Sequence, residues 1–223
     1  MKRSTDHLIA QLAASAAPVK RLRPPLIRAT FWLVAVAAAA AIGLPFFADF
    51  SLFAQRMADP KFVIETAATA LTGIAGVIAA FELSVPDRSP AWAWLPAPPL
   101  ALWLASSGYN CWRDWITVGD NGWHIGESGA CFAAIIGFSL PLGATLFVLL
   151  LRARPLAPVQ VAAEAGLGIA GLAAFFLAFN HPIDASFLDL GWHALAIGLV
   201  IATASTLGRL RQQRDAEELA REI

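Results

Sequence analysis

Long runs of apolar residues alternate with short polar segments along most of this chain. Six runs stand out, at residues 29–47, 62–81, 91–109, 129–151, 161–179 and 190–208. An α-helix needs about 20 mostly apolar residues to cross the hydrocarbon core of a bilayer. The pattern therefore predicts an all-α membrane protein with six transmembrane helices.

A different pattern occupies residues 1–28, ahead of the first long run. Leu8, Ile9 and Leu12 recur there at helical spacing, and polar residues with N-cap chemistry precede them. Pro18 ends the pattern because it lacks the N–H that a continuing helix needs. We predict a short amphipathic helix in this segment, followed by a basic stretch and then by the membrane domain.

Charge supports the membrane assignment and predicts an orientation. Only 14% of the 223 residues are charged, whereas soluble domains have about a quarter. If both termini are cytoplasmic, all but three of the 16 Lys and Arg residues lie inside, the exceptions being Arg56, Lys61 and Arg113. The positive-inside rule thus predicts a cytoplasmic head (1–28), a six-helix membrane domain (29–208) and a cytoplasmic tail (209–223).

Two of the predicted helices carry small residues at every fourth position, and the fourth predicted helix contains Pro141, which is expected to kink it. Ladders of small residues allow helix backbones to approach closely in lipid, so we expect tight packing at both. In residues 62–81 the ladder is Ala68, Thr72, Gly76 and Ala80, and in residues 161–179 it is Ala162, Gly166, Ala170, Ala174 and Ala178.

The ionisable residues of the spans bear on a second hypothesis, a small transporter or channel. Glu65, Glu82, Glu164 and His193 all lie near helix ends, where a side chain reaches the interface or contacts a helix end. None lies at mid-depth, which disfavours proton-coupled transport. Glu65 and Glu164 nevertheless occupy similar places in their helices, as an inverted three-plus-three repeat would require. No nucleophile, zinc or phosphate-binding motif predicts an enzyme.

Two cysteines and two histidines fall on the predicted extracytoplasmic side. Cys111 and Cys131 flank the longest outer loop, and His124 and His181 lie on the same side. A disulfide, two separate thiols, or a thiol that senses metal or oxidant all fit this placement. The set could also bind a soft metal, although its spacing matches no metal motif. This leaves a membrane-embedded redox enzyme or a metal-handling subunit as a third hypothesis.

Several short motifs, in this order, resemble the NrsF-like family of membrane anti-sigma factors, which are negative regulators of extracytoplasmic-function sigma factors in bacteria. The resemblance covers essentially the whole chain. It is carried by Leu8-Ile9 with Leu12, Ala16-Ala17-Pro18-Val19, Leu22-Arg23-Pro24-Pro25, Cys131, Pro141, Leu150-Leu151-Arg152, Ala157-Pro158, the small residues from Gly166 to Ala174, and the stretch from Asn180-His181-Pro182 to Trp192-His193.

The resemblance implies a head that sequesters a sigma factor at the bacterial inner membrane, without contacting nucleic acid itself. The apolar side of the head would dock into a groove of its partner, because six basic residues give no attraction to a DNA-binding protein. We assign this contact to Leu8, Ile9, Leu12, Pro18, Val19 and Leu22.

The resemblance also implies that extracytoplasmic cysteines respond to metal or oxidant stress. His181 stands where many family members have a second cysteine, so either Cys111 replaces it or His181 acts as a metal ligand. The candidate sensing set is Cys131, Cys111, His181 and His124. No resident cofactor is expected beyond a metal ion bound as a transient signal.

Overall fold

The fold was analysed in a computed structural model, which describes residues 5–15, 22–118, 125–179 and 187–222. Every regular element in these ranges is a helix. The α-helices are α1 (Thr5–Ser15), α2 (Pro25–Gly43), α3 (Phe50–Arg56), α4 (Pro60–Leu83), α5 (Ala97–Val118), α6 (Ile125–Leu151), α7 (Pro158–Leu177) and α8 (Phe187–Glu222), with 3₁₀ turns η1 (Leu44–Phe46) and η2 (Pro90–Trp94) between them.

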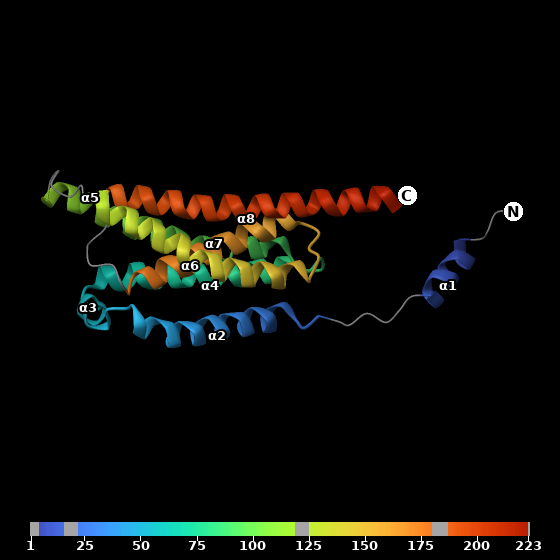
Figure 1. Cartoon of the computed structure of the whole chain (residues 1–223), viewed down its shortest axis with the longest axis horizontal. Coiled ribbons are helices and arrows are strands. Elements are labelled where there is room, and N and C mark those ends of the chain that lie inside the picture. The colour runs from blue at the N-terminus through green and yellow to red at the C-terminus, as the bar shows by residue number, and fades with distance from the viewer. Residues whose placement is uncertain (1–4, 16–21, 119–124, 180–186, 223) are drawn as a thin grey trace.

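The long helices α2, α4, α5, α6, α7 and α8 lie side by side along one axis, and both termini are at the same end (Figure 1). At the centre, α4 packs on α7. Around this pair, α2 and α5 contact α4, while α6 and α8 contact α7. Helix α1 lies beyond the end of the bundle that carries the termini. We call the end of the bundle that carries the termini the terminal end.

Within the part of the chain that the structure describes, four helices are long and apolar enough to cross a membrane. They correspond to the first, second, fourth and fifth predicted spans and run over Pro25–Phe46, Pro60–Leu83, Phe132–Leu151 and Pro158–Leu177. These helices support membrane association. The third and sixth predicted runs lie within α5 and α8, which are not among the four, so the six-span topology and its orientation stay predictions.

Two local elements differ from the sequence-based expectation. The third helix does not begin at residue 91, because Pro90–Trp94 forms a 3₁₀ turn and α5 starts at Ala97. The short helix α3 was not predicted at all. Asp49 caps it, since its Oδ1 accepts hydrogen bonds from the N–H groups of Leu52 (2.9 Å) and Ser51 (3.0 Å). The bond from Leu52, followed by those from Ser51, holds the pKa of Asp49 below its usual value.

The predicted close approach of small residues is confirmed. A Cβ added to Gly76 would lie 2.7 Å from Cα of Gly168, and one added to Gly73 would lie 2.7 Å from the backbone N of Leu172. Helices α4 and α7 therefore touch backbone to backbone, through segments 73–76 and 168–171, which both have the sequence Gly-Ile-Ala-Gly.

The partner of the predicted small-residue ladder on α7 is decided by the fold. Gly166 of that ladder faces α8, where an added Cβ would lie 2.9 Å from Cα of Ile201. Gly168 and Gly171, which the ladder did not include, face α4 instead. Helix α7 thus uses two different small-residue faces, one toward α4 and one toward α8.

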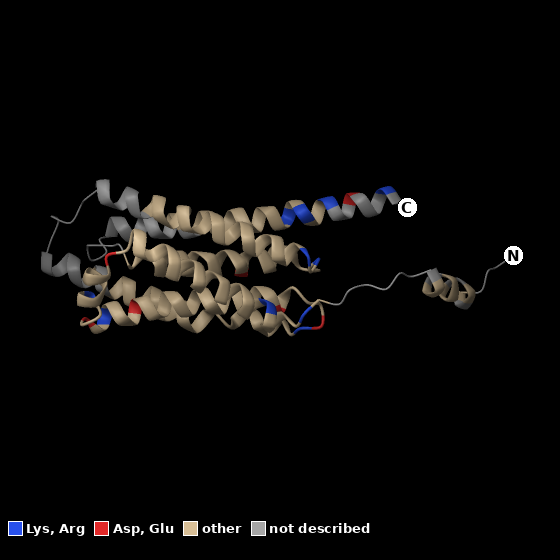
Figure 2. Cartoon of the chain, turned by 60° about the horizontal axis from the view of Figure 1, so that its bottom comes forward, with Lys and Arg blue, Asp and Glu red and all other residues tan. Residues whose placement is uncertain are grey.

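Most charged residues of the described bundle lie toward its two ends, with mainly uncharged ribbon between them (Figure 2). The terminal end carries Arg28 in the first turn of α2, Arg88 after α4, and Arg152 and Arg154 after α6. This distribution agrees with a bundle whose middle lies in hydrocarbon and whose ends lie among lipid headgroups.

Candidate functional site

The head contains a helix where the apolar pattern predicts one, since α1 ends at Ser15, before Pro18. Of the predicted partner-binding residues, Ile9 is 59% exposed and Leu22 is 51% exposed. Pro18, Val19 and the side chains of Leu8 and Leu12 lie outside the described residues. The binding role of this set stays a prediction.

The predicted sensing residues also lie outside what the structure describes in side-chain detail. His124 and His181 fall outside the described ranges, and only the backbone is described for Cys111 and Cys131. Cys111 belongs to about the last two turns of α5 and Cys131 to about the first two turns of α6. Among the described residues, no three His, Cys, Asp or Glu side chains gather into a metal site.

Helix α2, which begins at the end of the head, is attached to α6 by two side-chain hydrogen bonds. Arg28 Nη2 donates to the carbonyl O of Leu149 over 2.8 Å, and Trp32 Nε1 donates to Thr145 Oγ1 over 3.2 Å. Within each helix the two residues are four apart and therefore lie one turn apart on the same face. We call Arg28, Trp32, Thr145 and Leu149 the α2–α6 clip.

The clip also contacts α4 and is partly buried. Trp32 is 5% exposed, and the guanidinium of Arg28 lies over the ring of Phe81, 5.0 Å from its centroid. Charge-assisted and buried hydrogen bonds are costly to lose, because their partners are left unsatisfied. The chain is therefore fixed to both α4 and α6 directly after the head.

On α6 the clip joins the helix one turn after its proline. Pro141 lies inside α6 and removes one backbone hydrogen bond from it. The Thr145 hydroxyl lies 3.0 Å from the carbonyl oxygens of both Pro141 and Leu142, to which it donates while accepting from Trp32. Helix α6 thus contacts the base of the head about one turn after its proline, while the backbone hydrogen bond that Pro141 lacks belongs to the turn before it.

Two carboxylates near helix ends are held by contacts within the protein. Glu82 is 1% exposed, and its Oε2 lies 3.2 Å from Nε of Arg88 in the following loop. This pairing compensates a charge that would otherwise be costly to bury. Ser107 of α5 donates to Oε1 of Glu65 in α4 over 2.6 Å.

A family model described as "Negative regulator of sigma F" matches residues 12–211. The chain belongs to this family, NrsF. Membership indicates a negative regulator of a sigma factor. It also confirms the family resemblance that the order of the sequence motifs indicates. No curated protein and no solved structure matches the chain.

The NrsF match covers most of α8 and all of the helices from α2 to α7, including the whole α2–α6 clip. It begins at Leu12, within α1, so Leu8 and Ile9 precede it. Sequence reasoning had counted Arg28 only as part of the basic stretch and had not assigned Trp32 or Thr145. The signal available was the spacing of four residues between Arg28 and Trp32 and the place of Thr145 after Pro141.

Proposed function

We propose that this chain is a multi-pass inner-membrane anti-sigma factor whose head, residues 1–28, holds an extracytoplasmic-function sigma factor at the membrane. The observation that carries the proposal is α1, an apolar-faced helix that lies clear of the bundle at its terminal end in an NrsF chain. The positive-inside rule puts this arginine-bearing end in the cytoplasm, where sigma factors act.

Capture rests on burial of the apolar side of the head. A helix that lies apart from its own bundle and exposes an apolar residue such as Ile9 suits the helix-in-groove mode of recognition. Lys20 and Arg21 lie close to the membrane on this topology, so they serve orientation and contact with lipid headgroups rather than the sigma factor.

The head alone is expected to capture the sigma factor. Residues 1–25 fused to a soluble carrier should retain the sigma factor from the same bacterium in a pull-down, because no other predicted cytoplasmic segment is both long and amphipathic. A full-length protein that lacks residues 2–18 should insert normally but lose repression of a sigma-dependent reporter. Undiminished repression by that deletion would contradict the proposal.

Release would start at the opposite end of the bundle. Cys131 in the first turns of α6 faces the cell envelope on this topology, where thiols meet soft metals and oxidants. A change there would travel along α6 to the turn after Pro141 and reach α2 through the α2–α6 clip. The clip supplies the contact between the sensing helix and the helix that positions the head.

Cys131→Ser is expected to leave repression intact and to abolish induction by a thiol-reactive metal and by peroxide. The measurement is a sigma-dependent reporter challenged with each agent. Cys111→Ser should behave in the same way if Cys111 is the partner thiol, and His181→Ala should do so if the site binds metal. Normal induction of Cys131→Ser by both agents would remove the sensing role from this residue.

A further inference from the structure

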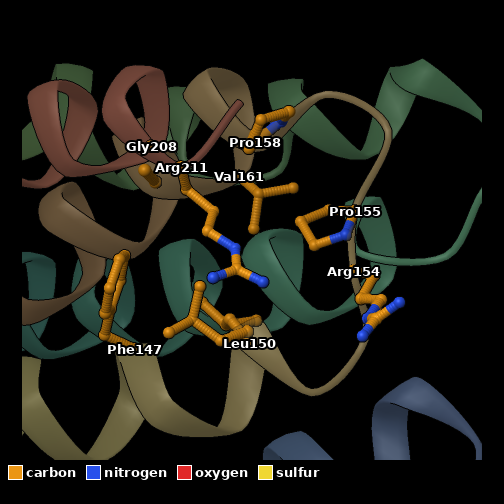
Figure 3. Close-up of a pocket in the computed structure, with 10 residues that line it drawn as sticks. Phe147, Leu150, Arg154, Pro155, Pro158, Val161, Gly208 and Arg211 are labelled. Carbon is orange, nitrogen blue, oxygen red and sulfur yellow. The ribbon is translucent and has the colours of Figure 1, made fainter. Parts of the chain in front are cut away.

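A pocket opens at the terminal end of the bundle, where α6 ends, α7 begins and α8 passes beside them (Figure 3). Its walls are largely apolar and include Phe147, Leu150 and Val161. The membrane-length segment of α6 ends at Leu151, and that of α7 begins at Pro158. The pocket therefore lies at the level where the hydrocarbon core of a bilayer would stop.

Two arginines are among the residues that line this pocket. Figure 3 shows the guanidinium of Arg211 reaching between Phe147 and Pro155, with Arg154 at the rim. Gly208 allows this placement, because an added Cβ would lie 2.7 Å from the carbonyl O of Pro158. Helix α8 therefore lies directly against the start of α7, and Arg211, about one turn later, projects over the pocket.

Arg154 has a backbone conformation that arginine rarely adopts. Its φ is 47°, in the left-handed region where glycine meets no steric cost. Glycine would therefore suit the backbone here, but it would remove a positive charge from the rim of the pocket. A substitution of Arg154 by glycine therefore tests the role of the charge without straining the backbone.

We propose that this pocket binds the phosphate headgroup of an anionic phospholipid from the cytoplasmic leaflet. Arg211 and Arg154 match the phosphate in charge, and the apolar walls continue into the membrane, where the acyl chains lie. Basic pockets between transmembrane helices on the cytoplasmic side are typical sites for such headgroups. The proposal rests on membrane insertion with the terminal end inside, and not on capture of the sigma factor.

The test uses full-length protein and compares phosphatidylglycerol with phosphatidylcholine. Retention of each lipid is measured by native mass spectrometry, and the thermal unfolding midpoint is measured in nanodiscs of each composition. We expect the protein to prefer phosphatidylglycerol and Arg211→Gln to reduce that preference about fivefold, since one arginine near an anionic surface contributes on this scale. Arg214→Gln is the matched control, because Arg214 is exposed on α8 outside the pocket.

Arg154→Gly is expected to weaken the preference for phosphatidylglycerol without lowering the unfolding midpoint in phosphatidylcholine, because glycine accepts the positive φ. A lower midpoint there would make Arg154 a structural residue and overturn its part in the site. Equal losses in Arg211→Gln and Arg214→Gln would reveal general charge attraction and overturn the pocket. Inorganic phosphate that displaces phosphatidylglycerol at millimolar concentration would overturn the lipid as the ligand.

Discussion

A head that carries Leu12→Asp is expected to lose capture of the sigma factor, with affinity reduced roughly 100-fold or more. Leu12 belongs to the predicted apolar side of α1 and is the first residue of the NrsF match. The substitution removes apolar burial from the contact and also forces a carboxylate to lose water without a partner. Leu8→Asp should act in the same way.

The measurement is the dissociation constant between the sigma factor and the head fused to a soluble carrier. Lys2→Ala is the matched control and should change the affinity little. The partner binds DNA, so its charge is not expected to attract a basic side chain. Circular dichroism of the isolated head peptides separates a lost contact from a lost helix. If basic substitutions weaken capture more than Leu12→Asp, recognition is electrostatic and the helix-in-groove account is wrong.

Gly76→Leu is expected to destroy the central helix pair and with it the folded bundle. The nearest neighbours of an added Cβ are backbone atoms of Gly168 at 2.7 Å, which cannot rotate away as a side chain would. Overpacking typically costs about 1–3 kcal/mol, and a clash between two backbones belongs at the upper end or beyond. Gly168→Leu should have the same effect from the other helix.

The measurement is the yield of folded protein and its thermal unfolding midpoint in detergent. Gly137→Leu is the matched control, since Gly137 is an exposed glycine in α6 and an added Cβ meets nothing within 4 Å. It should leave the midpoint nearly unchanged, because leucine also has a higher helix propensity than glycine. Equal midpoints for Gly76→Leu and Gly137→Leu would contradict the backbone contact between α4 and α7.

Sequence patterns predicted the helices of this protein well where the length of an apolar run is enough to identify a helix. The apolar runs at residues 62–81 and 161–179 correspond to α4 and α7, because the length needed to cross a bilayer can be counted along the chain. The pattern failed at η2 and at α3. The apolar stretch from residue 91 does not reveal a 3₁₀ turn, and the seven residues of α3 are too few to show helical periodicity.

The candidate site was likewise predicted only in part. Periodicity predicted the helix of the head, and the order of family motifs predicted the NrsF assignment, because the periodicity and each single motif can be read along the chain. The α2–α6 clip was not predicted, since Arg28 and Leu149 are 121 positions apart and only the tertiary fold brings Nη2 of Arg28 within 2.8 Å of the Leu149 carbonyl O.

By itself, the sequence determined the helical content, the apolar segments, the basic terminal end and the family of this protein. The tertiary structure alone decided which small-residue face of α7 meets α4, that Arg28 bonds to α6, and that Arg211 lies over a pocket. The physical reason is that helical periodicity shows which residues share a face but not which neighbour covers it. That choice depends on the packing of all the helices together.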